Sequence, residues 1–345
     1  MKLEAKELAS SYQEEPSTNQ SADSLPLVTV VIPTYNSAQY IGETLKSVLN
    51  QEYPRLEVIV VDDGSTDNTK DAVDAFDSNR VTYLYQANSG GPARPRNKGI
   101  QQARGRYIAL IDSDDIMLPG KIERAVRMLV RDPQLGLVFT DFVKFDEMIG
   151  QYPGAHLDTY HNFSKLPKKQ VEESEYIILA EAAYNALISE NYIGLSGVVM
   201  PQEVFSRIGI FDESLSGPED YDMWLRITSA YDIGFIDMIG HRYRIRPDSL
   251  TSSGGDKFLS HLSRVMQKQL GRSLPDATRE NIRKKLAYQL WELGYYYQLS
   301  EETILARRYY ALSIRQGCFW LPCKGLLTTL LPPNLLRTLK KLRGY

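Results

Sequence analysis

The chain has 345 residues, of which 43% are hydrophobic and 24% are charged, a composition typical of a globular protein with a sizeable core. Its formal net charge of −3 gives no general electrostatic reason to expect nucleic acid as a partner. The two cysteines, Cys318 and Cys323, support neither a disulfide framework nor a regularly spaced zinc cluster, and favour a reducing cytoplasm.

The first part of the chain is polar. Residues 1–26 are expected to form a disordered tail, because few large apolar groups stand among the Glu, Ser, Gln and Asn residues there. Nothing near Met1 combines a basic start, an apolar stretch and a small-residue cleavage site, and no run of about 20 apolar residues occurs. We therefore expect a cytoplasmic protein that does not span a membrane.

From Val28 onward, apolar runs of strand length alternate with amphipathic segments of helix length. Strands are predicted at residues 28–32, 56–61, 81–85, 107–111 and 136–145, and helices at 38–50, 68–76, 92–103 and 121–131. This order is typical of a doubly wound α/β fold with a mostly parallel sheet. Ligands of such sheets bind at the carboxyl ends of the strands.

After residue 145 the alternation is less regular. The later elements are predicted as a loop over the site at 146–169, a helix at 173–188, a short strand at 197–200, a helix at 221–230 and a bent strand or hairpin at 233–243. Beyond Gly254 the pattern is helical throughout. We therefore predict an α/β domain at 27–253 and a helical C-terminal region at 254–345, with a hinge at 246–255.

The predicted strand at 107–111 ends in an acidic cluster, residues 112–115. Like charges this close raise one another's pKa unless a cation or a set of N–H donors compensates them. Sites rich in oxygen ligands suit Mg²⁺ or Mn²⁺. Asp62 and Asp63 follow the strand at 56–61, and the two acidic strand ends are expected to face one cleft.

Five strings, in this order, carry a resemblance to a known family: VTVVIPTYN, VIVVDDGSTD, SGGPARPRNKG, YIALIDSDD and GPEDYDMWLRI. They resemble glycosyltransferase family 2, which has the GT-A fold, a Rossmann-like fold of nucleotide-diphospho-sugar transferases. The resemblance covers residues 27–253. It implies inverting transfer of a sugar from a nucleotide-sugar donor, with a UDP-sugar expected, to a hydroxyl of a glycan, polysaccharide or lipid-linked acceptor.

The resemblance assigns the nucleoside of the donor to the ends of the first two strands. The residues concerned are Pro33, Thr34, Tyr35, Asn36, Asp62 and Asp63. It implies that Asp63 accepts a hydrogen bond from the base. The alternative is that Asp62 and Asp63 only cap the turn that follows them.

The glycine-rich loop at residues 90–92 precedes a helix that carries Arg96 and Asn97. N–H groups at a helix start favour anions and guanidinium groups bind phosphate, and the resemblance assigns Arg96 and Asn97 to the donor side. Pro95 stands where the family more often has a small residue. A shifted first turn, with the roles of Arg94 and Arg96 exchanged, is therefore one alternative, and an ordinary helix start with solvated basic residues is another.

Asp112, Ser113 and Asp114 match the DXD motif of the family, which implies that Asp112 and Ser113 lie on the donor side and that Asp114 binds a divalent metal, Mn²⁺ or Mg²⁺. Asp112 is expected to contact ribose, a metal-bound water or the metal itself. A cation would stabilise the charge that develops on the leaving diphosphate. The alternative is a cap of the helix near Pro119. Arg246 stands where a histidine is frequent, and arginine neutralises diphosphate but is a poor metal ligand.

Glu219 and Asp220 lie at the start of a predicted helix, where a carboxylate is held rigidly. An inverting transferase needs one base to take the proton of the acceptor hydroxyl. The resemblance gives this role to Asp220, with Glu219 as the near alternative. A third possibility is that both only cap the helix.

The C-terminal segment from Leu321 has many leucines, several Lys and Arg residues and no acidic residue. This mix suits an interfacial segment on anionic lipid at the inner face of the membrane, although Pro332 and Pro333 would divide it. Packing against the body of the protein is the alternative that the sequence leaves open.

Two other functions are weighed against transfer. A sugar-1-phosphate nucleotidyltransferase should carry a glycine-rich loop with Arg and Lys after the first strand, and residues 33–36 do not form one. A catalytically silent nucleotide-sugar-binding protein would not need both Asp114 and Asp220.

Overall fold

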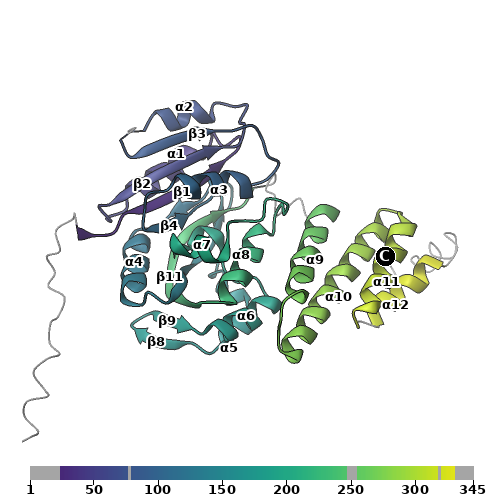
Figure 1. The fold of residues 1–345 in the computed structure, drawn as a ribbon. Coiled ribbons are helices and arrows are strands. Elements are labelled where there is room, and N and C mark those ends of the chain that lie inside the picture. The colour runs from purple at the N-terminus through teal and green to yellow at the C-terminus, as the bar shows by residue number, and fades with distance from the viewer. Residues whose placement is uncertain (1–23, 77–78, 247–254, 318–319, 331–345) are drawn as a thin grey trace, which may run out of the picture.

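The computed structural model describes residues 24–76, 79–246, 255–317 and 320–330. A central sheet carries helices on both faces, and helices α9 to α12 extend to one side of it (Figure 1). Residues 1–23 of the predicted tail at 1–26, residues 247–254 of the predicted hinge at 246–255, and residues 331–345 lie outside the described residues.

The strands occur at the following positions: β1 Val28–Thr34, β2 Leu56–Asp62, β3 Val81–Tyr85, β4 Tyr107–Leu110, β5 Ile116–Met117, β6 Leu135–Asp146, β7 Gly150–Gln151, β8 Lys169–Glu172, β9 Glu175–Ile178, β10 Val199–Pro201 and β11 Asp232–Arg244. The α-helices are α1 Ile41–Leu49, α2 Thr69–Asp74, α3 Ala93–Gln102, α4 Lys121–Arg131, α5 His161–Lys165, α6 Ala180–Ser189, α7 Glu203–Ile208, α8 Glu219–Thr228, α9 Asp256–Leu270, α10 Asp276–Leu299, α11 Thr303–Arg315 and α12 Trp320–Leu330.

The strand order is β3-β2-β1-β4-β10-β6-β11-β9-β8. Strands β3, β2, β1 and β4 are parallel, and β6 is parallel to β11, whereas β10, β9 and β8 pair in antiparallel fashion. The predicted fold class, a mostly parallel α/β sheet with helices after it, is confirmed. The ends of β1 and β2 meet, because Asp63 N–H donates to the Thr34 carbonyl at 2.9 Å.

Both faces of the sheet are buried at β1, β2 and β4, which explains why these strands are mostly apolar rather than alternating. Val30 and Ile32 belong to a core shared with α1 and α4, whereas Val31 belongs to a core shared with α3, α6 and α8. Helix α3 lies close to the sheet at Gly99, where an added Cβ would stand 2.5 Å from a Val31 methyl. The sheet therefore fixes α3 and α8 on the same face.

The prediction of one helix over residues 173–188 is wrong. The chain first forms β9, which pairs with β8 through a turn at Ser174 with φ of 61°, and α6 begins only at Ala180. The buried Glu175 accepts a hydrogen bond from Arg131 of α4 at 2.7 Å. The sequence has no Gly, Pro or Asn to mark this turn, and the ion pair that favours the hairpin is a long-range one.

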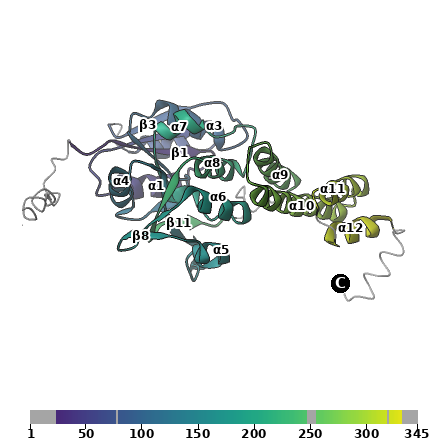
Figure 2. The same cartoon turned by 60° about the horizontal axis from the view of Figure 1, so that its bottom comes forward.

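Residues after 255 are helical, as predicted, within the part of the chain that the structure describes. Val265 and Met266 of α9 and Leu286 of α10 belong to the same core as α6 and α8. Farther out, the ring of Tyr310 in α11 packs against Gly294 of α10, where an added Cβ would stand 2.5 Å from the ring. Figure 2 shows α9 to α12 continuing away from the sheet. None of the described helices is both long and apolar enough to cross a bilayer.

Candidate active site

The acidic cluster follows β4 directly and its members differ in exposure. Side chains of Asp112 and Asp114 are 33% and 17% exposed, whereas Asp115 is fully buried. Asp115 accepts a hydrogen bond from Arg244 N–H at 3.0 Å, and burial with the neighbouring aspartates raises its pKa well above its usual value. Thr44 Oγ1 donates to the Asp115 carbonyl at 2.8 Å and so holds the turn against α1. Asp112 and Asp114 are thus the members available to a ligand.

Arg96 joins this strand end to α8. Its Nη2 lies 2.7 Å from Asp112 Oδ1 and its Nη1 lies 2.5 Å from Glu219 Oε1, while its side chain is only 4% exposed. Burial opposes the charge, but the two carboxylates hold the pKa of Arg96 above its usual value. Arg96 N–H donates to the Pro92 carbonyl, as in a regular α-helix. Pro95 therefore does not shift the first turn of α3. The neighbouring Arg94 is exposed.

Glu219 and Asp220 begin α8, where carboxylates are favoured by the helix dipole. Glu219 uses both oxygens, since its Oε2 also accepts from Gly217 N–H at 2.9 Å. Asp220 Oδ1 accepts from Tyr221 N–H at 2.6 Å. Burial and the neighbouring Glu219 raise the pKa of Asp220 to about 7, although Arg96 opposes the shift. Asp220 therefore has the properties of a proton acceptor near neutral pH.

Arg246 lies beside Asp114, with 3.1 Å between Nε and Oδ2. Burial and Asp112 raise the pKa of Asp114 to about 6, and Arg246 opposes this rise. Arg244, which the sequence reasoning missed, donates from Nε to the Asp114 carbonyl at 2.9 Å and forms ion pairs with Glu43 and Glu147. Arginines at alternate positions along the end of β11 were the sequence pattern that could have indicated Arg244.

The ends of β1 and β2 are held mainly by contacts inside the protein. Asp62 accepts from Ser65 N–H at 2.7 Å and from Tyr83 Oη at 2.6 Å. Asp63 accepts from Ser89 N–H at 2.9 Å and from Gln86 Nε2 at 2.6 Å. These bonds fit the turn-capping alternative for Asp62, and they place Asp63 next to the glycine-rich loop.

The first motif divides into buried and exposed members. Pro33 and Thr34 are buried within β1, whereas Tyr35 is 50% exposed. Asn36 has φ of 49° and its Oδ1 accepts from Thr66 N–H at 2.8 Å, so it fixes the loop after β1 against the loop after β2. Of these side chains, Tyr35 and Asn36 are the exposed ones.

Two predicted donor-side residues are engaged elsewhere. Asn97 Nδ2 donates to the Phe211 carbonyl at 2.9 Å and to Glu213 Oε1 at 3.0 Å, so its amide holds the loop before α8. Ser113 Oγ lies 2.8 Å from Ser37 Oγ, in the loop between β1 and α1.

Ser196 and Lys121 bond to the acidic turn or to each other, and neither belongs to a sequence motif. Asp112 N–H donates to Ser196 Oγ at 3.1 Å, and the buried Lys121 donates to the Ser196 carbonyl. Burial lowers the pKa of Lys121 to about 7, against the influence of Asp115. His241 is also buried nearby, with its ring 4.8 Å from that of Phe142.

Whether the acidic turn fits a divalent cation depends on its free oxygens. Within the described ranges, no group of three or more His, Cys, Asp or Glu side chains is arranged to hold a metal ion. The ion pairs occupy one oxygen each of Asp112 and Asp114. Mg²⁺ and similar ions are commonly held by one or two carboxylates together with substrate phosphates. The two carboxylates therefore fit a cation that is completed by a diphosphate.

Comparison with known proteins gives a consistent result. Residues 29–191 match the model of the family described as glycosyl transferase family 2. Glycosyltransferase GlyG of Streptococcus pneumoniae serotype 4 is 41% identical over 128 residues, which are 36% of this chain and 42% of GlyG. The Escherichia coli UDP-Glc:alpha-D-GlcNAc-diphosphoundecaprenol beta-1,3-glucosyltransferase WfgD is 29% identical over 66% of this chain and 80% of its own length. The match thus spans less than half of GlyG.

Solved structures share the fold at low identity. Residues 1–349 of S. aureus TarS in complex with UDP-GlcNAc align with a TM-score of 0.61 and 21% identity, over 85% of this chain and 82% of that one. The mannosyltransferase PcManGT of Pyrobaculum calidifontis, in complex with GDP-Man and Mn²⁺, aligns with a TM-score of 0.55 and 20% identity, over 96% and 88% of the two chains.

Proposed function

Because this chain belongs to glycosyltransferase family 2, we propose that it moves a sugar from a nucleoside-diphosphate donor, a UDP-sugar, to a hydroxyl of a glycan or lipid-linked acceptor with inversion. One observation carries the proposal. Arg96 joins Asp112 of the acidic turn to Glu219 of α8, so that Asp220, with its raised pKa, is held close to the acidic turn. The donor complexes of TarS and PcManGT and the acceptor in the name of WfgD support the substrate classes.

The donor is proposed to lie along the carboxyl ends of β1, β2 and β4. Tyr35 is exposed beside the expected nucleoside site, and Asp63 is fixed there by Ser89 and Gln86. Asp112 and Asp114 would hold a divalent cation, Mn²⁺ or Mg²⁺, at the diphosphate. When bound, such a cation stabilises the negative charge of the leaving diphosphate. Arg246 is close enough to Asp114 to add a positive charge there.

Asp220 is the proposed general base. The acceptor oxygen forms a bond to C1 of the sugar, the bond from C1 to the diphosphate oxygen breaks, and the acceptor proton passes to Asp220. The electron pair of the broken bond leaves with the nucleoside diphosphate. A pKa of about 7 suits this step, because a base with a pKa near the working pH is both ionised and able to hold a proton. Glu219 has both oxygens engaged and serves to position Arg96.

A nucleotide screen tests the proposal. A ligand that binds the folded chain at 100 times its Kd raises the free energy of unfolding by about 2.7 kcal/mol. The purified chain is heated with UDP, GDP, their sugars and Mn²⁺, and we expect one nucleotide to raise the melting temperature more with Mn²⁺ than without it. No shift with any nucleotide would contradict the proposal. Binding without release of nucleoside diphosphate would instead favour a silent binding protein.

A further inference from the structure

Helix α9 lies against the segment that leads into α8. We call residues 212–222 the entry segment, because it contains both Glu219 and Asp220. On one side it touches the glycine-rich loop, where Ser216 Oγ lies 3.4 Å from the Gly90 carbonyl oxygen. On another side Glu219 bonds to Arg96. The position of this segment therefore sets the position of Asp220 relative to the donor side.

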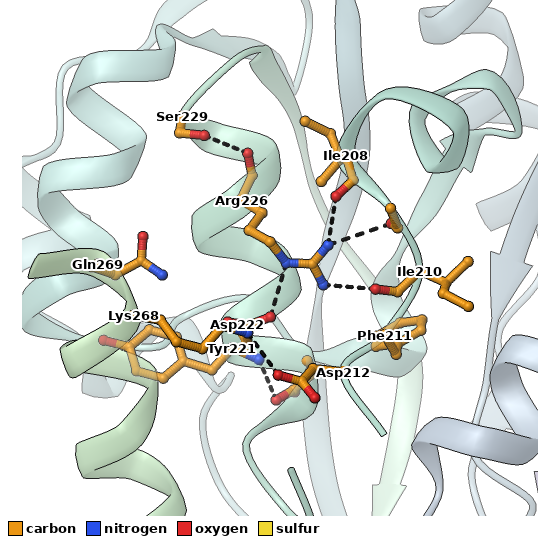
Figure 3. Close-up of polar contacts among 12 residues, drawn as sticks. Ile208, Ile210, Phe211, Asp212, Tyr221, Asp222, Arg226, Ser229, Lys268 and Gln269 are labelled. Atoms are coloured by element: carbon orange, nitrogen blue, oxygen red, sulfur yellow. Dashed lines mark hydrogen bonds and ion pairs between the residues drawn. The ribbon is translucent and has the colours of Figure 1, made fainter. Parts of the chain in front are cut away.

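Lys268 of α9 links both ends of the entry segment. Its Nζ lies 2.8 Å from Asp212 Oδ2 and 2.6 Å from Asp222 Oδ1 (Figure 3). The Asp222 side chain is fully buried and its other oxygen accepts from Arg226 Nε at 2.8 Å. A buried carboxylate needs such charged partners, and loss of one is costly. One ammonium group thus holds the two ends of the entry segment together.

The loop before Asp212 is held by the same network. Arg226 Nη1 donates to the Ile208 carbonyl at 2.8 Å and Nη2 donates to the Ile210 carbonyl at 2.9 Å (Figure 3). The next residue, Phe211, is the one whose backbone bonds to Asn97 of α3. Contacts therefore run from α9 through α8 to the helix that carries Arg96.

Two further residues of α9 contact the middle of the entry segment. His261 Nδ1 accepts from Ser216 N–H at 2.9 Å. The Phe258 ring lies against Gly217, where an added Cβ would stand 2.5 Å from ring atom Cδ2, and the φ of 107° at this glycine is also unfavourable for other residues. Phe258, His261 and Lys268 are spaced by three and seven residues and so share one face of the helix.

From these contacts we propose that Lys268 is a positioning residue of the transferase site. From α9 it fixes both ends of the entry segment and thereby holds Asp220 where the acceptor hydroxyl is deprotonated. The inference rests on the proposed function for the role of Asp220. It makes the first helix of the C-terminal region a part of the catalytic unit, because a displacement of about 1 Å at a reacting group can cost a hundredfold in rate.

Hydrogen exchange of the full chain tests whether Lys268 fixes the entry segment. Lys268→Met is compared with wild type and with Lys284→Met, a matched control on α10 whose side chain is 68% exposed. We expect faster amide exchange within residues 212–222 in Lys268→Met and no change there in Lys284→Met. His261→Ala removes the imidazole that contacts the Ser216 backbone and leaves the Lys268 ion pairs in place, and it serves as the second variant should Lys268→Met fail to fold. Unchanged exchange in the entry segment overturns the proposal.

Kinetic measurements test whether Lys268 also affects catalysis, with the nucleotide sugar that the thermal screen identifies as substrate. At a temperature well below every melting transition, Lys268→Met is expected to lower kcat on the order of tenfold while the KM for the donor stays the same. Lys268→Arg keeps the charge and should recover most of the loss. Faster exchange with unchanged kcat overturns the positioning role.

The two proposals fail in different ways. If the wild-type chain turns over no nucleotide sugar, the proposed function fails and the positioning role of Lys268 falls with it. The exchange measurement then still decides whether α9 anchors the entry segment. If wild type is active and Lys268→Met matches it in both measurements, only the inference about α9 fails.

Discussion

Arg246 and Asp114 form an ion pair, with 3.1 Å between Nε and Oδ2, at the acidic end of β4. The guanidinium supplies part of the positive charge that the carboxylates of this turn require. A cation bound at Asp114 therefore shares this carboxyl with Arg246. The arginine lies where resemblance to the family led us to expect a histidine, and it makes the metal requirement a property to be measured.

Replacement of Arg246 should change the metal requirement. Arg246→Ala removes a like charge from beside the proposed cation. We therefore expect the activity of this variant to reach half of its maximum at a lower Mn²⁺ concentration than that of wild type. The KM for the donor should rise, because a positive charge near the diphosphate is lost. Arg308→Ala, on the exposed surface of α11, is the control and should behave as wild type. A higher Mn²⁺ requirement in Arg246→Ala would show that the arginine assists metal binding instead.

Asp220→Asn should abolish transfer without loss of donor binding. The amide cannot accept the proton of the acceptor, and removal of a general base typically lowers the rate by about 10²–10⁴-fold. Turnover is followed by release of the nucleoside diphosphate, and donor binding by the thermal shift. Asp71→Asn, at an exposed position of α2, is the control. Turnover by Asp220→Asn within a few fold of wild type would remove Asp220 from the mechanism.

The rate of sugar transfer should rise with pH, because Asp220 has a raised pKa and acts as a base only when it is ionised. The base acts when ionised, so kcat/KM for the acceptor is expected to rise as the pH passes through about 7 and then to level off. A rate that falls over this interval would contradict the assignment.

The same group should affect stability with a definite sign. Its raised pKa means that the folded state binds a proton more tightly than the unfolded state, so this stabilisation is present at low pH and is lost as the pH rises through about 7. Asp220→Asn avoids the buried charge. The melting temperature of the variant relative to wild type should therefore be higher at about pH 8 than at about pH 5. An equal difference at the two pH values would argue against a raised pKa.

Loss of Arg96 should destabilise the fold as well as the site. Arg96→Met leaves the buried Glu219 without its partner, and breaking such a pair typically costs about 3–5 kcal/mol. Arg96→Lys keeps the charge but not the fork that reaches both Asp112 and Glu219, and it should be intermediate. Chemical denaturation measures both, with Arg94→Met as the exposed control. Equal stability of the Arg96 and Arg94 variants would show that the bridge contributes little.

The sequence was sufficient for the parallel strands β1, β2, β3 and β4 and for the sheet edge that carries the candidate site. Apolar runs such as residues 56–61 end in carboxylates, and the carboxyl ends of parallel strands meet at one edge. The sequence left open whether Arg94 or Arg96 points inward. The regular first turn of α3 decides this, because Pro95 needs no hydrogen-bond donor there.

The residues that were missed act through contacts between distant parts of the chain. Ser196 and Lys268 belong to no local motif, and Arg244 is marked only by the alternation of arginines near it. Each of the three bonds to groups that the fold alone brings close. The β8–β9 hairpin was missed for a similar reason, since Glu175 is stabilised by arginines of α4. Local sequence patterns predict where polar side chains follow the strands, but not which of these side chains pair with one another.

Release of nucleoside diphosphate from nucleotide sugars tests the central claim most directly, because slow hydrolysis needs no acceptor. Wild type and Asp114→Asn are each incubated with UDP- and GDP-sugars and Mn²⁺. We predict that wild type releases nucleoside diphosphate from at least one donor. The rate of release by Asp114→Asn is expected to fall to that of the enzyme-free control. Release by Asp114→Asn equal to wild type, or no release by wild type from any nucleotide sugar, would contradict the account.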